Sequence, residues 1–487
     1  MSQRQLWVVN PDLVYGLGQD EVRMFTELCR TWSERLSRNS LRLTYYRSKN
    51  KLDDLGISIP PPLRSVETAV GWPAKAVDAL AARSVFDGFT FGGEEDAELS
   101  RILDENDFAE QYQEAVTSEL VTSPAFCTVT RGQGDEPEVI TSFYSALNAC
   151  ALWDWRRRRV RCGFTITDYD ETQLYGSIPS RLNFYTEGNV FECWRSRNGR
   201  WSTRRMDNPQ GRPLMEALCY RPSLDRPFGK SRISRSVMSI TDSAVRTALR
   251  SEVAAEFFTS PQRYLLGADE DTFKDDPDGK KLKMWMGAVQ VFTTNREGDT
   301  PQYGQLQAMS MQPHVDYMRS LAARLSGETG IPGSMLGVIH DNPSSAEAMY
   351  AASEELIIEA EALNRTNGRA LRNVARLVTA VRQGKTLAEL TEDELAVRPN
   401  FKNPMRPSIA STADAMAKIA GVLPDFAGTD VFWEQLGFSE DVRDRVRTQL
   451  RTSQARSAAM ATAQAALAQG RQVTDGGIAG QAEQVSV

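Results

Sequence analysis

Histidine is almost absent from this chain of 487 residues, which contains only His314 and His340. Imidazole is the commonest metal ligand in proteins and the usual general base of nucleophilic catalysis. Two histidines provide almost no material for a histidine-based metal site or for a Ser-His-Asp triad. We therefore expect both residues to be polar side chains at the surface or at an interface.

Paired cysteines and long apolar runs are missing as well. The six cysteines show no CxxC spacing, so the sequence indicates neither a zinc site nor a redox pair, and we expect reduced thiols that lie mostly in the core. No stretch approaches the roughly 20 apolar residues of a membrane helix, and the N-terminus has neither a basic start nor an apolar run. The sequence thus predicts a soluble protein, cytosolic during synthesis, with no membrane partner. The cysteines are Cys29, Cys127, Cys150, Cys162, Cys193 and Cys219.

A phosphate-binding loop is the nearest approach to an enzymatic motif. The segment DRPFGKS ends like such a loop, but that motif requires Gly five positions before the glycine of its Gly-Lys pair. Leu224 stands at that position, and Pro227 stiffens the segment. We therefore predict no enzymatic activity and no cofactor.

Helical periodicity dominates the second half of the chain. Over residues 231–258, apolar residues recur at three- and four-residue steps, which predicts an amphipathic helix, roughly 40 Å long, that Ser231 can cap. A second helix over 312–329 should stop at Gly330 and Pro332, which disfavour its continuation. The apolar positions of the first helix are Ile233, Val237, Ile240, Ala244, Ala248, Leu249, Val253 and Phe257.

A third and longer helix is predicted from Ser344 to about Arg382, where Ala, Glu, Leu and Arg are frequent. Asn367 and Gly368 are poor helix formers in the middle of this run, so we expect a kink there. The acidic pairs of the helix are interpreted as a solvated face or as subunit contacts. These pairs are Glu354 with Glu355 and Glu359 with Glu361.

The region from Thr128 to about Tyr220 has a different character. Its residues alternate between apolar and polar, which predicts β-strands, and the tandem turns TEGN and RNGR mark antiparallel hairpins. The part before this region, through about Leu120, is predicted to be mainly helical. Helices and antiparallel strands together indicate an α+β protein.

The order and spacing of these elements resemble the portal proteins of tailed bacteriophages, and especially the large branch common in phages of actinobacteria. Each matching segment is weakly specific alone, but their order over most of the chain is highly specific. The segments are TYYRSKNKLDDLGISIPP (44–61), VDALAARSVFDGFTF (77–91), RILDENDFAEQYQEAVTSELVTSPAFCTV (101–129), ALCYRPSLDRPFGKSRIS (217–234), SPQRYLLG (260–267), GIPGSMLG (330–337) and SSAEAM (344–349).

The resemblance implies a portal fold with an α/β wing, a long α-helical stem, a small α/β clip, a long kinked helix and a helical crown, in a ring oligomer. The implied regions are 1–230 for the N-terminal and wing region, 231–258 for the first stem helix, 259–311 for the clip, 312–332 for the second stem helix, 333–345 for the tunnel loop, 346–383 for the long kinked wing helix, 384–450 for the crown-proximal helical region, and 451–487 for a C-terminal helix and flexible tail.

The resemblance also implies two functional surfaces. The tunnel loop would face DNA through His340, Asp341 and Asn342, and because it has no Lys or Arg we expect steric and weak polar contact. Arg319 and Arg324 of the second stem helix are candidate channel-facing residues. A plain surface loop between two helices is the alternative interpretation. The candidate partner-binding residues of the clip are Asp269, Glu270, Asp271, Lys274, Lys280, Lys281 and Lys283.

The implied role is that of a non-enzymatic virion protein at the unique capsid vertex, assembled in the host bacterial cytoplasm. It would form a homo-oligomeric ring, dodecameric in the family, through which double-stranded DNA is packaged and ejected without sequence specificity. The implied partners are the terminase large subunit, the major capsid and scaffold proteins, and a head-tail adaptor protein. The net charge of −7 suits a conduit that must not grip DNA, although it is also ordinary for a soluble chain of this length.

The basic run WDWRRRRVRCGF (Trp153 to Phe164) leaves several interpretations open. We favour a solvated or intersubunit strand over binding to a scaffold or capsid protein, and either over nucleic-acid binding. Two other functions also stay open for the whole chain. One is a different structural head-tail connector of a phage virion, and the other is a cellular helical adaptor or nucleic-acid-binding protein that is monomeric or dimeric.

Overall fold

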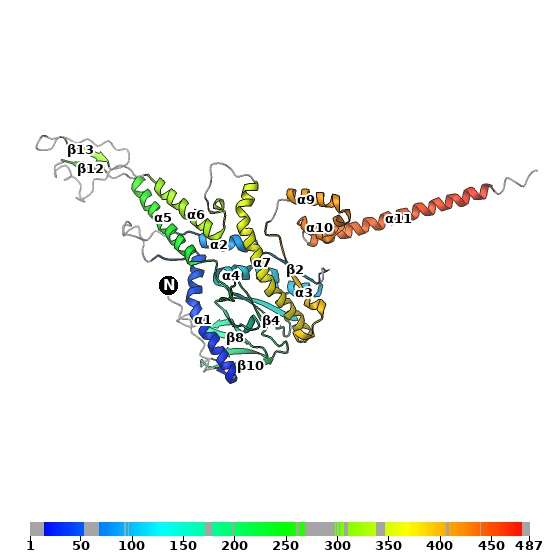
Figure 1. Cartoon of the computed structure of the whole chain (residues 1–487), viewed down its shortest axis with the longest axis horizontal. Helices are drawn as coiled ribbons and strands as arrows, with labels where there is room; N and C mark the ends of the chain where they lie inside the picture. The colour runs from blue at the N-terminus through cyan, green and yellow to red at the C-terminus, as the bar shows by residue number, and fades with distance from the viewer. Residues whose placement is uncertain are drawn as a thin grey trace, which may run out of the picture. The chain divides into compact units, whose positions relative to one another are not determined.

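The computed structural model describes residues 14–52, 68–91, 94–95, 97–170, 178–196, 199–259, 263–267, 298, 300, 302–305, 310–337, 346–405, 409–438 and 440–479. The chain divides into two compact units, Met1–Pro404 and Met405–Val487. Helices and mostly antiparallel sheets make up the first unit, and this is the α+β class that the sequence predicted (Figure 1).

A six-stranded sheet forms one layer of the first unit. Its order is β1-β10-β9-β8-β7-β6, and all neighbours are antiparallel except the β1–β10 pair. The two hairpins β8–β9 and β9–β10 confirm the turns predicted from TEGN and RNGR. The strands are β1 (Val14–Tyr15), β6 (Ala149–Asp154), β7 (Arg159–Asp170), β8 (Ile178–Tyr185), β9 (Asn189–Arg195) and β10 (Trp201–Asp207).

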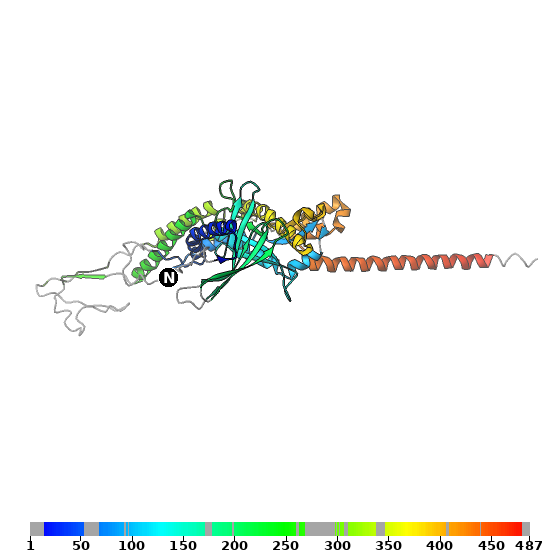
Figure 2. The ribbon, with the colours of Figure 1, turned by 90° about the horizontal axis from the view of Figure 1, so that it is seen from below.

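Helix α1 (Gln19–Tyr46) covers one face of this sheet (Figure 2). Its Phe25 ring lies 5.3 Å from the Phe184 ring of β8, between centroids. Trp32 packs edge-on against Phe164 of β7 and donates its indole N–H to the Leu147 carbonyl at 3.0 Å. Burial of these large aromatic side chains provides much of the stabilisation of this layer.

Two smaller sheets complete the body of the first unit. β11-β4-β5 contacts α4 and α7, and β14-β2-β3 lies beside the same two helices. One continuous apolar core joins all these elements, as expected when one sheet face and one stripe of each helix must leave water. The elements are α2 (Trp72–Ala81), β2 (Phe86–Phe91), β3 (Glu94–Glu95), α3 (Ala97–Asp104), α4 (Phe108–Thr122), β4 (Ala125–Arg131), β5 (Val139–Ser145), β11 (Met215–Leu218), α7 (Ala346–Gln383), η5 (Leu387–Glu389), α8 (Glu392–Leu395) and β14 (Arg398–Phe401).

Helices α5 (Arg235–Thr259) and α6 (Gln312–Thr329) pack side by side as a hairpin (Figure 1). β12 (Arg263–Leu266) follows α5, β13 (Gln302–Gln305) precedes α6, and the two strands pair antiparallel. Helix α6 ends before Gly330, whose φ of +65° stops it at the residue that the sequence predicted. The side chains buried between the helices include Val237, Ile240, Ala244, Leu321 and Leu325.

The predicted cap of the first helix is wrong. Helix α5 begins at Arg235, and the Ser234 hydroxyl accepts a hydrogen bond from the Val237 N–H at 3.1 Å. Ser231 instead donates its hydroxyl to the Val121 carbonyl at 2.6 Å, and the Arg232 N–H donates to the Leu120 carbonyl. These contacts hold residues 231–234 against the end of α4, so the helix starts one turn later.

Helix α7 continues through Asn367 and Gly368, and the kink expected at these residues stays a prediction. Both residues make contacts that other residues would not permit. The Asn367 amide is fully buried and donates to Glu119 of α4 at 2.8 Å. A Cβ at position 368 would lie 3.3 Å from the Phe401 ring, so Gly368 permits the close approach of β14.

The second unit contains helices only, among the residues that the structure describes. The region 451–487 was expected to be a helix followed by a flexible tail. Helix α11 begins before that region, at Glu440, and continues to Ala479. Extending an existing helix adds one hydrogen bond per residue, which offsets the low propensity of Gly476 and Gly477. The elements are α9 (Ile409–Val422), η6 (Pro424–Gly428), α10 (Asp430–Gln435) and α11 (Glu440–Ala479). Among the described helices, none has the length and apolar content required to cross a membrane.

Candidate functional site

The predicted site residues fall into two groups. Arg319 and Arg324 lie on the solvent-exposed side of α6, opposite the side that packs against α5. Arg319 lies 3.9 Å from Asp316 between charged atoms, and both side chains are more than half exposed, so this ion pair contributes little. The remaining predicted site residues lie outside the described residues. They are His340, Asp341 and Asn342 of the tunnel loop, and Asp269, Glu270, Asp271, Lys274, Lys280, Lys281 and Lys283 of the clip.

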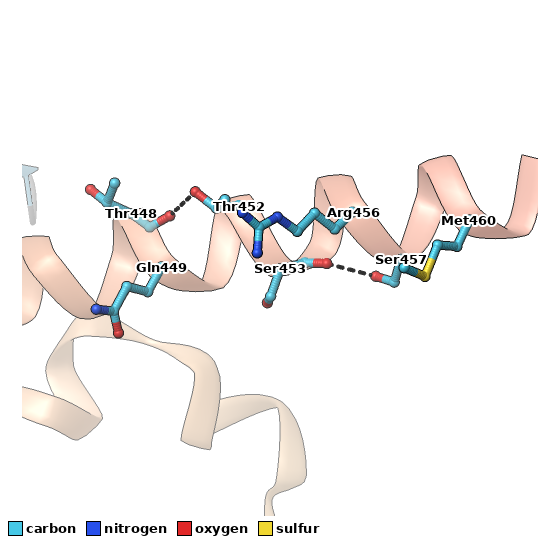
Figure 3. A pocket seen from close by; sticks show the side chains of 7 residues that line it. All are labelled: Thr448, Gln449, Thr452, Ser453, Arg456, Ser457 and Met460. Carbon is cyan, nitrogen blue, oxygen red and sulfur yellow. Dashed lines mark hydrogen bonds between the residues drawn. The ribbon is translucent and has the colours of Figure 1, made fainter.

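A shallow hollow on α11 offers no chemical site (Figure 3). It is formed by one side of a single helix. Its Thr452 and Ser457 hydroxyls donate to the carbonyls of Thr448 and Ser453, one turn earlier. Hydroxyl groups bonded to their own helix in this way are occupied and do not converge on a ligand.

The principal polar cluster lies at the base of the α5–α6 hairpin, in the connecting segment between β11 and α5 (residues 219–234). Arg232 exposes only 3% of its side chain and forms an ion pair with Glu359 of α7. Its guanidinium also donates to the Ala76 carbonyl of α2 and to the Thr329 carbonyl at the end of α6, both at 2.6 Å. One side chain therefore joins α2, α6 and α7, and we name this cluster the Arg232 hub.

Tyr220 and Arg221 complete the Arg232 hub. The Tyr220 hydroxyl accepts from the Arg232 guanidinium at 3.0 Å and donates to the Glu359 carboxylate. Burial raises the pKa of Tyr220 to about 12, while the positive charge of Arg232 opposes this shift. Arg221, which is 54% exposed, lies 2.9 Å from the same carboxylate. All the strongly polar groups are hydrogen-bonded, so the hub is suited to fixing helices and not to proton transfer.

The interpretation of Glu359 as a solvated or intersubunit residue is therefore wrong. The Glu359 side chain is buried and has three partners in the same chain. A glutamate in an Ala- and Glu-rich helix carries no local signal of burial, because the partner Arg232 lies 127 positions earlier. Sequence reasoning also missed Arg232, which was seen only as part of a segment typical of the family.

A second buried network joins α4 and α7. Glu119 is completely buried, and burial raises the pKa of its carboxyl to about 8, although the hydrogen bond from Asn367 opposes the shift. Asn367 also donates to the Tyr112 hydroxyl at 3.3 Å, which in turn lies 3.0 Å from the Ser84 hydroxyl. Among the described residues, no cation lies close enough to stabilise a charged Glu119 carboxylate. The Glu119 carboxyl is therefore protonated at neutral pH.

The cysteines lie where the sequence predicted them. All six are free and buried, and burial raises their thiol pKa values, for example to about 12 for Cys29. Buried thiols of this kind behave as small apolar side chains and are inert.

Gly229 is the glycine of DRPFGKS, the segment that ends like a phosphate-binding loop. Its φ is +69°, and a Cβ there would lie 2.2 Å from the Tyr220 carbonyl oxygen. That carbonyl accepts from the Lys230 N–H at 2.9 Å, so the chain crosses itself beside the Arg232 hub. The glycine therefore serves backbone packing.

Replacing Gly229 by alanine should lower the free energy of unfolding by about 2 to 3 kcal/mol, because strain at positive φ and a backbone clash add together. Gly211→Ala is the matched control, since Gly211 has a φ of +71° and open space around its Cβ position. We expect a loss of about 1 kcal/mol for the control. Urea unfolding of both variants measures the difference, and equal losses would show that the clash is relieved at no cost.

In these contacts, buried polar residues hold a helical hairpin against a helix-and-sheet body. Over residues 28–462 the chain matches the family model described as phage portal protein, SPP1 Gp6-like. The chain therefore belongs to the phage portal protein family, and the resemblance stated from its sequence is confirmed. This membership establishes its function in the DNA channel of the virion, and it decides against a different connector and against a cellular adaptor.

Two relatives that are phage portal proteins agree with this assignment. The chain is 24% identical over 430 residues to the portal protein of Mycobacterium phage D29, with 83% of each chain covered. It is 24% identical over 404 residues to the portal protein of Mycobacterium phage L5, with 78% of each covered. Among solved structures, a chain from the neck of an empty gene transfer agent particle is 10% identical, with a TM-score of 0.45, and the match covers 80% of this chain and 90% of that one.

Proposed function

We propose that twelve copies of this chain form a closed ring and that the α5–α6 hairpin is the stem of its channel. The observation that carries this proposal is the attachment of the hairpin: Arg232 and Glu359 lock its base to the body, and β12 and β13 connect the other ends of its two helices. A rigid hairpin of this kind suits a channel wall that must withstand a moving load. β12 and β13 belong to the clip, the body before α5 is the wing, and residues 384–450 form the crown-proximal region.

Exposed apolar side chains of the second unit support an assembly of several copies. Val422, Leu423 and Met460 each expose more than half of their surface in the single chain. Removing apolar surface from water is favourable, and neighbouring copies in a ring would cover such residues. A ring requires a heterologous interface, in which two different surfaces of the chain meet.

The proposal extends to the path of DNA and to the partners of the ring. Arg319 and Arg324 of α6, with His340 to Asn342 of the tunnel loop, contact double-stranded DNA without reading its sequence. The clip residues 269–283 bind the terminase large subunit and later the head-tail adaptor. The wing contacts the capsid and scaffold proteins, and assembly takes place in the host bacterial cytoplasm.

Light scattering on the purified chain tests the ring. Twelve copies of 54.3 kDa give a particle of about 650 kDa, and negative-stain images of the same fraction should show a central hole. A ring of different mass would change the number of copies only. A monomer that persists at high concentration and with added scaffold protein would contradict the proposal.

A further inference from the structure

A cleft of about 570 Å³ lies on the first unit. Four elements form it: the β6–β7 hairpin, β11, the connecting segment and α7. The basic run 153–164 supplies one wall of this cleft. The proposed channel function gives this run no role. The residues that matter to the argument are Trp155, Arg158, Pro222, Leu224, Pro227 and Arg369.

The apolar part of the cleft is unusually exposed. Trp155 exposes 62% of its surface and Leu224 exposes 76%. The Asp154 carboxylate accepts from the N–H groups of Arg156 and Arg157, each at 3.0 Å, which holds the hairpin turn that carries Trp155. Such an aromatic side chain, exposed on a fixed turn at the edge of a concave surface, is typical of a binding anchor.

The charged part of the cleft is positive. Arg369 donates to the Arg158 carbonyl at 3.1 Å, which keeps the two residues together. Within the described part of the chain, neither guanidinium forms an ion pair with a carboxylate. The nearby acids are already paired, since Glu187 binds Arg157 and Arg159, and Glu216 binds Arg212.

Further arginines add to this positive potential. Burial lowers the pKa of Arg212 to about 10, and the charges of Arg159, Arg376 and Arg369 lower it further. Three arginines, Arg158, Arg159 and Arg369, line the cleft itself, against one acidic residue, Glu216. A ligand with the opposite charge would be attracted to this cleft.

We propose that this cleft binds an acidic, extended segment of a partner protein. An apolar side chain of that segment packs among Trp155, Pro222 and Leu224, and its carboxylates pair with Arg158 and Arg369. Guanidinium groups bind carboxylates through two parallel hydrogen bonds, which gives both affinity and orientation.

The shape of the cleft favours a peptide over a nucleic acid. A single-strand binding groove follows the phosphate backbone with a row of cations and provides successive aromatic stacking surfaces. Here the cations flank walls of proline and leucine, and Trp155 is the one strongly exposed aromatic ring among the residues named above. Recognition of a short acidic segment with an apolar anchor matches both the charge and the walls.

Fluorescence anisotropy on the full-length protein tests this proposal, both as rings and as any monomer present. The probe is a labelled nine-residue peptide, EEDLLFDEE, and a lysine-substituted peptide, KKKLLFKKK, serves as its charge control. The acidic peptide should bind in the micromolar range, and the double variant Arg158→Glu with Arg369→Glu should weaken binding by about tenfold or more. Leu224→Ser should weaken it about fivefold without affecting the fold, because that side chain is exposed.

Arg445→Glu is the matched control, because Arg445 is exposed on the second unit and takes part in no cleft. Equal binding by the control and by the double variant would show non-specific attraction and overturn the proposal. A labelled twelve-nucleotide DNA strand that binds more tightly than the peptide, and is lost in the double variant, would overturn it in favour of nucleic acid. Binding by the monomer but not by the ring would also overturn it, since the cleft would then be covered by the neighbouring copy.

Discussion

Replacing Arg232 by alanine should lower the free energy of unfolding by about 3 to 5 kcal/mol, the largest effect that we expect from a single polar substitution in this protein. The substitution leaves the buried Glu359 carboxylate without its main partner. It also removes the donors for the carbonyl groups of Ala76 and Thr329. Because Thr329 ends α6, the hairpin should lose its attachment to α7, and rings should form poorly.

Two controls separate burial from charge. Arg221→Ala removes a partner of the same Glu359 carboxylate, but Arg221 is 54% exposed, so we expect a loss below about 1 kcal/mol. The double variant Arg232→Met with Glu359→Gln replaces the ion pair by neutral groups and should lose less than Arg232→Ala alone. Urea unfolding at one protein concentration measures all three. Similar losses for Arg232→Ala and Arg221→Ala would show that the Arg232 hub does not fix the hairpin.

Replacing Glu119 by glutamine should stabilise the protein at alkaline pH and change little at pH 5. Burial holds the folded pKa of Glu119 at about 8, whereas an unfolded glutamate titrates near 4.3. Between these values the folded state keeps a proton that the unfolded state has released, so the stability of the natural protein falls as pH rises, and the loss is complete above about pH 8. Glutamine imitates the protonated carboxyl and removes this loss, a gain of up to about 5 kcal/mol at pH 8.5.

Melting curves at pH 5 and pH 8.5 measure this difference. Glu354→Gln is the control, because Glu354 lies on the exposed side of α7, and it should change stability by less than about 0.5 kcal/mol at both pH values. Parallel pH profiles for the natural protein and Glu119→Gln would mean that the carboxyl is ionised in the fold. The Asn367 hydrogen bond would then stabilise the charge more strongly than burial opposes it.

Local sequence patterns were sufficient to predict several helices and hairpins and to identify the family. Three- and four-residue periodicity predicted α5 and α6, and Gly330 marked the end of α6 because only a residue that tolerates positive φ can follow it there. The turns of the β8–β9 and β9–β10 hairpins followed from their glycine and asparagine residues. These features depend on residues only a few positions apart, so they can be predicted from a single sequence.

The environment of polar residues inside helices could not be predicted from the sequence. Glu359 was interpreted as part of a solvated face or as a subunit contact, and the sequence assigned no buried partner to Asn367. Both are buried against groups far away in the chain. Local helix propensity is the same whether a carboxylate or an amide on an Ala-rich helix faces water or a buried partner. Only the packing of α7 against α4 and the connecting segment decides between these environments.

The sequence by itself determined most of the helices and hairpins, the apolar positions of α5 and α6, and that this is a portal protein. The tertiary structure alone decided that Arg232 joins α2, α6 and α7, that Glu119 is buried with a raised pKa, and that the basic run borders an apolar cleft. The reason is physical: propensity and periodicity act over a few residues, whereas desolvation and ion pairing depend on which distant groups the fold brings into contact.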